Sequence, residues 1–80
     1  MEMAGLKEAI AEPLFPDVLK VNKTVEIESN ANNPSNMLPP GEYKSTESEF
    51  DGMHIYTSKG KQWFLWPEDM DRLNDAQALI

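Results

Sequence analysis

Cysteine is absent from the 80-residue sequence, and its absence excludes two common ways of stabilising a small protein. Without thiols the chain can form neither disulfide bonds nor thiolate metal sites. A single domain of this length buries only about 60% of the surface that its unfolded chain exposes. We therefore expect a small hydrophobic core, or a partner subunit, to hold the fold together.

Basic residues are few. Seven Lys and Arg stand against 14 Asp and Glu, which gives a net charge of −7 and a pI near 4.5. This charge repels a phosphate backbone, so direct binding to nucleic acid is not expected. The same charge favours solubility and speeds the encounter with a basic protein. A basic protein is thus the expected kind of partner. The alternative explanation of the negative charge is that it only keeps the protein soluble.

Long apolar runs are also missing. The opening stretch, MEMAGLKEAIAEPLF, carries acidic residues at Glu2, Glu8 and Glu12. It contains no apolar segment of the length that a signal peptide or a membrane-spanning helix requires. We interpret the chain as cytoplasmic, with no membrane among its partners.

Glycine and histidine are too sparse to build the usual ligand sites. The four glycines are isolated and form neither a dinucleotide fingerprint nor a P-loop. The single histidine, His54, has only Asp51 or Glu49 near it in the sequence, which is too few ligands for zinc. No clear serine or carboxylate pattern marks His54 as a catalytic group. We expect no enzyme activity, no metal and no cofactor.

Two segments near the start have regular apolar spacing. Helical spacing predicts a short helix over Glu2–Ala11, which a proline ends, and a proline-containing linker leads on to residue 19. Residues 20–28, KVNKTVEIE, alternate with the two-residue period of a half-buried strand. Val25 and Ile27 should face the core.

Turn signals at short intervals organise the rest of the chain. The loop Ser29–Pro40 precedes them, and Asp51-Gly52 and Ser58–Lys61 are typical of hairpin turns. Pro67 suits the first position of a helix, followed by two acidic residues that the helix dipole favours. The segments between these signals predict strands at 42–50, with Tyr43 facing inward, at Met53–Thr57 and at Gln62–Trp66. Spacings this short leave no room for crossover helices, so the fold class should be mainly β and antiparallel.

Four consecutive apolar residues close the last predicted strand. Alternation places Trp63 and Leu65 on one face and Phe64 and Trp66 on the other. One pair must therefore leave the barrel core. Either the terminal or the amino-terminal helix covers that second face, or the face is exposed and contacts a partner.

Acidic residues alternate along two predicted strands. Glu47, Glu49 and Asp51 form one row, and Glu26 and Glu28 form another. Exposure of these strand faces to solvent explains both rows. The alternative is that the carboxylates imitate a row of phosphates. The candidate partner-binding residues are Trp66, Phe64, Tyr56, His54, Glu47, Glu49, Asp51, Glu26 and Glu28.

The closing stretch GKQWFLWPEDMDRL, after a long loop and a glycine-led strand, resembles the small SH3-like barrel proteins of bacteriophages and prophages. The resemblance covers about residues 20–73. It implies a barrel of about four to five antiparallel strands at residues 20–66, flanked by a short N-terminal helix and a C-terminal helix at 67–80, in a single domain. Eukaryotic peptide-binding SH3 domains carry an ALYDY motif and a paired tryptophan signature, and this sequence has neither.

Proteins of the phage type with known roles tend to bind a host or phage protein, and the resemblance implies the same here. The leading hypothesis is a non-enzymatic, acidic binding module that inhibits or modulates a host protein, with nucleic-acid-binding proteins among the candidates. The alternative is a structural or accessory phage protein that self-associates as a homodimer through its aromatic face.

Overall fold

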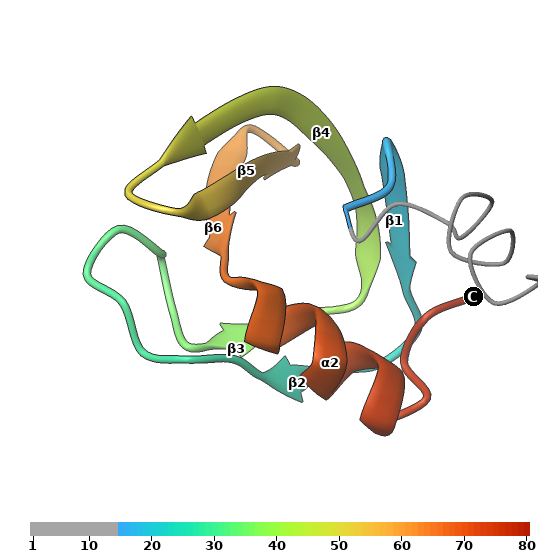
Figure 1. Ribbon diagram of the computed structural model, residues 1–80. Helices are drawn as coiled ribbons and strands as arrows, with labels where there is room; N and C mark the ends of the chain where they lie inside the picture. Colours follow the sequence, from blue (N-terminus) through green and yellow to red (C-terminus); the bar gives the residue numbers. More distant parts are fainter. Residues whose placement is uncertain (1–14) are drawn as a thin grey trace, which may run out of the picture.

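The computed structural model describes residues 15–80 and shows a mainly β architecture (Figure 1). Six strands form two antiparallel sheets, and one helix follows them in the described part of the chain. The elements are β1 (Val18–Val21), β2 (Val25–Glu26), β3 (Met37–Leu38), β4 (Gly41–Phe50), β5 (Met53–Ser58), β6 (Lys61–Leu65) and α2 (Pro67–Asp75). The predicted fold class is confirmed, and the predicted helix over Glu2–Ala11 lies outside the described residues.

The larger sheet contains the predicted meander. Its strand order is β1-β4-β5-β6, and β2 pairs with β3 in the second sheet. Figure 1 shows β4 arching over the molecule, with α2 and the β2–β3 pair on the opposite side of the space that it encloses. The sheet therefore curls around a core that the helix closes.

Two tight turns fix the register of the meander. Asp51 and Gly52 have φ values of 53° and 87°, and Lys59 and Gly60 have 53° and 78°. Two consecutive positive φ angles are typical of the two-residue hairpin turns that match the twist of antiparallel strands. Gly52 has a second reason to lack a side chain, because a Cβ there would lie 3.1 Å from Cζ3 of Trp66. Both predicted turns are confirmed.

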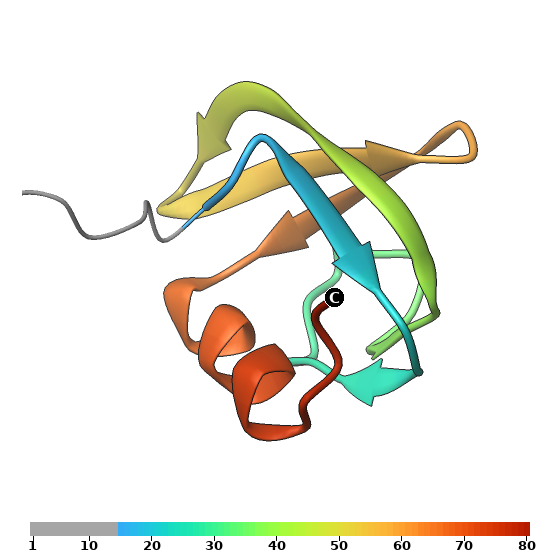
Figure 2. The same ribbon diagram turned by 90° about the vertical axis from the view of Figure 1, so that its right-hand side faces the viewer.

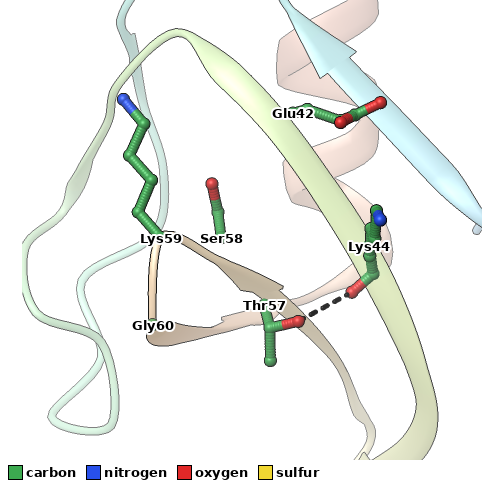
Figure 3. A pocket seen from close by; sticks show the side chains of 6 residues that line it. All are labelled: Glu42, Lys44, Thr57, Ser58, Lys59 and Gly60. Atoms are coloured by element: carbon green, nitrogen blue, oxygen red, sulfur yellow. Dashed lines mark hydrogen bonds between the residues drawn. The ribbon is translucent and has the colours of Figure 1, made fainter.

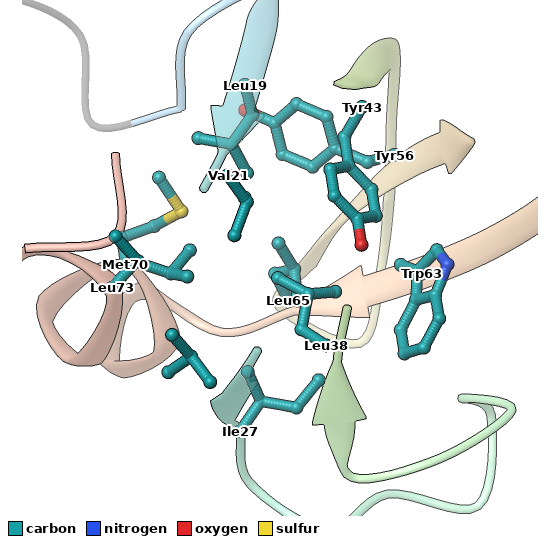
Figure 4. Close-up of a cluster of buried hydrophobic side chains, with 12 residues drawn as sticks. Leu19, Val21, Ile27, Leu38, Tyr43, Tyr56, Trp63, Leu65, Met70 and Leu73 are labelled. Atoms are coloured by element: carbon teal, nitrogen blue, oxygen red, sulfur yellow. The ribbon is translucent and has the colours of Figure 1, made fainter. Parts of the chain in front are cut away.

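The core collects the inward faces of both sheets and of the helix (Figure 4). Trp63 and Leu65 are 4% and 0% exposed, so they share one face, as their strand alternation predicts, and that face is the inner one. The Trp63 ring meets the Tyr43 ring edge to face, with centroids 6.2 Å apart. The other buried members are Leu19, Val21, Val25, Ile27, Leu38, Tyr56, Met70, Leu73 and Ala78. Val25, Ile27 and Tyr43 thus face inward as predicted.

Helix α2 begins where the sequence predicts. Pro67 occupies its first turn, and the extended residue before it, Trp66, donates its backbone N–H to Oδ2 of Asp69 at 2.9 Å. This bond satisfies a backbone donor at the helix start. Met70 and Leu73 then point into the core.

The ends of the barrel depart from the predicted boundaries. The chain bends at residues 22–24, so the predicted single strand over 20–28 is two strands, β1 and β2, in different sheets. The barrel also starts at Val18 and not at residue 20. The prediction was wrong because Val21 and Val25 both face the core, which an uninterrupted strand allows but does not require.

The C-terminal residues leave the helix and join the sheet. The helix ends at Asp75, and Gln77 turns the chain with a φ of 56°. Leu79 then forms an antiparallel bridge with Val21, and Ile80 donates its N–H to the carbonyl of Lys20 at 3.1 Å. Figure 2 shows this tail running beside β1. The predicted helix over 67–80 is therefore too long.

The two tyrosines of the chain make the core sensitive to alkali. Burial raises the pKa of Tyr43 and of Tyr56 from 10.0 to about 12, and the charge of Asp17 adds to the effect on Tyr56. Both phenol groups donate hydrogen bonds, to the carbonyls of Pro39 and Pro16. Unfolded tyrosines ionise near pH 10, so their burial contributes stability below pH 10 that is lost as the pH rises towards 12.

We therefore expect the melting temperature to fall steadily between pH 10 and pH 12. Tyrosinate absorbance should rise together with unfolding, because these are the only tyrosines in the chain. Ionisation of both groups near pH 10 with the circular dichroism unchanged would contradict this expectation.

Candidate functional site

An aromatic surface lies on the outer face of the sheet, at the β4–β5 turn. Phe50 is opposite Met53, and Ile55 is opposite Phe64, so these side chains share the face that points away from the core. Trp66 follows Phe64 by two residues. Phe50 is 51% exposed and meets Phe64 edge to face, with ring centroids 6.0 Å apart. We call Phe50, Phe64 and Trp66 the aromatic patch.

The long loop after β2 covers part of this outer face. Asn33 accepts a hydrogen bond from the Phe64 N–H at 2.6 Å and donates one to the Phe64 carbonyl at 2.9 Å. Asn30 donates to Sδ of Met53 at 2.9 Å, and Met53 is 3% exposed although it lies outside the main core. The Asn33 amide thus pairs with the open edge of β6 as a neighbouring strand would.

The structure tests only part of the interpretation that a helix covers the second aromatic face, because the predicted amino-terminal helix lies outside the described residues. The terminal helix does not cover it, because α2 packs Met70 and Leu73 into the core on the other side of the sheet. The loop covers Met53 and the backbone of Phe64, while Phe50 remains half exposed. Among residues 15–80, the second face is therefore a partly exposed aromatic surface.

Three of the predicted acidic residues lie beside the aromatic patch, but not in a regular row. The β4–β5 register shifts between Ser45 and Glu49, and Glu47 adopts a φ of 60° within this bulge. Asp51 belongs to the turn. Glu47, Glu49 and Asp51 are exposed in the arm of the hairpin that ends at Phe50 and its turn, and we call them the acidic arm, but Glu49 lies opposite His54 and so points to the other face of the sheet from Phe50. The predicted alternation is wrong because a bulge, which the polar sequence 45–48 does not reveal, interrupts the pleat.

Glu26 and Glu28 belong to another part of the molecule. They lie on β2 and just after it, and they line a depression with Arg72 of α2. Oε1 of Glu28 is 3.9 Å from Nη1 of Arg72. These two carboxylates therefore do not extend the acidic hairpin.

A buried carboxylate joins this region to the helix. Asp69 is fully buried, and its Oδ1 accepts bonds from the Glu28 N–H at 2.9 Å and from Nη1 of Arg72 at 2.6 Å. Its Oδ2 accepts the Trp66 N–H already described. Each oxygen is thus satisfied, as a buried charge requires. Asp69 holds α2 against the segment after β2, and the sequence marked it only as a helix-start residue.

His54 has a serine partner that the sequence did not reveal. Oγ of Ser45 lies 2.8 Å from Nε2 of His54, and Phe15 stacks on the imidazole ring with centroids 4.6 Å apart. The Ser45 hydroxyl also accepts the N–H of Glu47 at 3.0 Å, which stabilises the bulge. Within residues 15–80, no hydrogen bond connects the imidazole to a carboxylate that would orient it as a base.

The geometry of Ser45 and His54 favours a structural contact. Tyr56, beside His54, is fully buried, so its predicted role as a partner contact is wrong. His54 is half-buried under Phe15 and offers a partner little of its ring. The sequence alone could not reveal the contact between Ser45 and His54. It depends on the β4–β5 register, which places Ser45 opposite Tyr56, two residues from His54.

Two further observations bear on the predicted absence of metal and membrane. Across residues 15–80, no three His, Asp or Glu side chains converge in a way that could hold a metal ion. In the same part of the chain, no helix combines the length and apolar character needed to cross a membrane.

Comparison with known proteins adds no relative: no protein-family model, curated protein or solved structure matches the chain.

Proposed function

We propose that this protein is a non-enzymatic binding module that captures a basic protein with the aromatic patch and the acidic arm of the β4–β5 hairpin. The observation that carries the proposal is the exposure of Phe50, half of whose surface is open to solvent at a hairpin end that also carries the exposed residues Glu47, Glu49 and Asp51. Exposed aromatic side chains are frequent anchors of protein interfaces. Carboxylates around such an anchor favour a partner with lysine and arginine side chains.

The surroundings of Phe50 support a prepared contact surface. Phe64 holds one edge of the Phe50 ring, and Asn33 fixes the backbone of Phe64. Trp66 packs over Gly52 at the adjoining turn. A surface held in this way loses little conformational entropy when a partner binds.

The charge of the protein supports a more specific proposal for the partner. A net charge of −7 speeds association with a basic protein, and nucleic-acid-binding proteins carry such basic surfaces. We propose that the partner is a host nucleic-acid-binding protein, that the module acts in the cytoplasm as a phage-type inhibitor or modulator of it, and that the carboxylates take the place of phosphates. The resemblance to small SH3-like phage barrels supports this assignment.

Capture from a bacterial lysate tests the role of Phe50. Wild type and Phe50→Ser are immobilised in parallel, with Val18→Ser as the matched control, since Val18 is 44% exposed on another strand. A basic protein should be retained by wild type and by the control but lost, by about tenfold or more, with Phe50→Ser. Equal retention by all three proteins would refute the aromatic patch as the binding site.

The acidic arm is tested on the association rate with the captured protein. Changing Glu47, Glu49 and Asp51 to their amides should slow association and reduce its dependence on salt. The melting temperature should barely change, because exposed carboxylates contribute within about 0.5 kcal/mol. An unchanged rate at low salt would show that these carboxylates do not steer the partner.

A further inference from the structure

Strand β6 forms one edge of the larger sheet, and part of that edge is open. The N–H and carbonyl of Phe64 point to the edge, because the Asn33 side chain binds both. Backbone groups alternate in direction along a strand, so the N–H and carbonyl of Gln62 point the same way. Within residues 15–80 these two groups of Gln62 have no hydrogen-bond partner. Gln62 therefore presents an open donor and acceptor beside a pair that is already bound.

The Asn33 side chain shows which chemistry this edge accepts. Its carboxamide offers one acceptor and one donor to Phe64, as the backbone of a neighbouring strand would. Asn33 is a single side chain, so the pairing stops there. An extended peptide offers the same two groups again at every second residue. The open pair at Gln62 thus fits an extended backbone.

A shallow depression runs beside Gln62, between β6 and the long loop. Asn33 and Pro34 line it on the loop side, and Thr57, Gln62 and Phe64 line it on the sheet side. Gln62 itself is exposed. A peptide strand that pairs with Gln62 therefore has room beside the edge and apolar contacts at Pro34 and Phe64.

Lysine side chains surround the end of this depression at the β5–β6 turn. Lys61 lines it, and a second depression adjoins it because Thr57 lines both. Figure 3 shows Lys44 and Lys59 on opposite sides of the second depression. Glu42 is the one acid among the described residues that line either depression. Three of the seven basic residues of the chain thus lie here, and they favour a ligand with carboxylates.

We infer that the β6 edge at Gln62 binds an extended, acidic peptide segment of another protein. The segment pairs with the Gln62 backbone and places carboxylates beside Lys59 and Lys61. Addition of a strand to an exposed sheet edge is a common mode of peptide recognition, in which the backbone supplies affinity and the side chains supply specificity. Asn33 limits the added strand at Phe64.

Binding at this edge should be weak and sensitive to salt. Each backbone hydrogen bond replaces one to water and contributes little net free energy, and salt screens exposed ion pairs. The net charge of −7 also slows the approach of an acidic segment. Low ionic strength and millimolar peptide are therefore the conditions in which binding is expected.

The inference goes beyond the proposed function, because it concerns the β5–β6 end of the sheet and a ligand of opposite charge. It is tested with synthetic peptides on the purified protein. Failure to capture a basic protein would leave this site untouched, and failure to bind the peptides would leave the capture assay untouched.

The probe is a blocked hexapeptide in which valine and glutamate alternate, added to the full chain. Hydrogen exchange of the Gln62 N–H, followed by NMR, should slow by about tenfold or more when the peptide pairs with it. The Val18 N–H, which points to the outer edge of β1, is the internal reference and should keep its rate. An unchanged rate at Gln62, or equal slowing at Val18, would refute the inference.

Two methylated analogues test whether the peptide backbone is used. One carries methyl groups on the valine nitrogens and the other on the glutamate nitrogens, so each removes the donors along one edge of the peptide strand. At least one analogue should bind about tenfold more weakly or worse, because its donor to Gln62 is lost. Equal binding of the parent and both analogues would exclude strand pairing.

Exchange of charge tests the lysines. A peptide with lysine in place of glutamate should bind wild type at least about tenfold more weakly, and the preference should reverse in a variant with Lys59→Glu and Lys61→Glu. The matched control carries Lys20→Glu and Lys23→Glu, which change the net charge equally at exposed residues elsewhere, and should keep the wild-type preference. A preference that stays the same in the folded Lys59–Lys61 variant, as judged by circular dichroism, would overturn the assignment of an acidic ligand.

Discussion

Replacing Trp63 with alanine is expected to destabilise the fold by about 3–5 kcal/mol. The indole is 4% exposed, lies on the inward face of β6 and contacts the ring of Tyr43 edge to face. Alanine would leave a cavity at the centre of the core that both sheets share. A chain of this length has a total stability of about 4–12 kcal/mol, so most of it could be lost.

Urea unfolding followed by circular dichroism measures this loss. Trp66→Ala is the paired comparison, because Trp66 is half-buried on the outer face and contacts Gly52 at the turn. We expect a cost of about 1 kcal/mol there, within the range of ordinary substitutions. Trp63→Phe provides a milder variant in case Trp63→Ala does not fold. Equal and severe effects at both tryptophans would mean that Trp66 is also a core residue, and the aromatic patch would then lose one of its members.

Replacing Asp69 with alanine is expected to cost about 3–5 kcal/mol, for an electrostatic reason. The carboxylate accepts hydrogen bonds from two backbone N–H groups, those of Glu28 and Trp66, and from the guanidinium of Arg72. Alanine would leave these donors without their acceptor in a region where Asp69 itself is fully buried. The start of α2 and the segment after β2 should therefore loosen together.

Two further variants separate this network from general helix effects. Asp71→Ala changes an exposed carboxylate two residues along the same helix and should alter stability by no more than about 0.5 kcal/mol. Asp69→Asn keeps one acceptor oxygen and should fall between the two alanine variants. Hydrogen exchange at the Glu28 and Trp66 amides should accelerate in Asp69→Ala. A stability loss as small as that of Asp71→Ala would show that Asp69 is not the link between helix and sheet.

Local chemistry was enough to predict the meander. Asp51-Gly52 and the Lys59-Gly60 turn need positive φ angles that few residues adopt, and Pro67 both ends a strand and begins a helix. Between those points, alternation placed Trp63 and Leu65 together on one face, which the structure shows to be the inner one. These predictions succeeded because each depends on residues within a few positions of one another.

Predictions that depended on distant segments were incomplete. Asp69 was recognisable as a helix-start residue, but its bond to the backbone of Glu28 spans 41 positions. The pairing of Asn33 with Phe64 spans 31 positions, and it places a loop on the outer face, where the terminal helix was one of the expected covers. A single sequence contains no signal that joins such pairs.

The candidate site was predicted in part. Phe64, Trp66 and the acidic arm were identified, but the residue with the most exposed aromatic ring, Phe50, was not among the candidates. Phe50 ends a strand of polar residues, and its side proves to be the outer one only after the bulge at Glu47 is placed. Tyr56 was wrongly predicted to contact a partner for a related reason. Its side chain proves to be interior only once the hairpin register places it opposite the buried Trp63.

The bridge between Val21 and Leu79 has a consequence for the order in which the fold assembles. Residue 79 completes an edge of the sheet that begins at residue 18, so β1 has neighbours on both sides only after the segment that follows α2 has folded back. Contacts this far apart in the chain form slowly, because a long loop must close first. Until then the chain exposes one edge of β1, which a chaperone can bind or another chain can join. The outer edge of β1 is therefore expected to be the part of the sheet that stays open longest during folding.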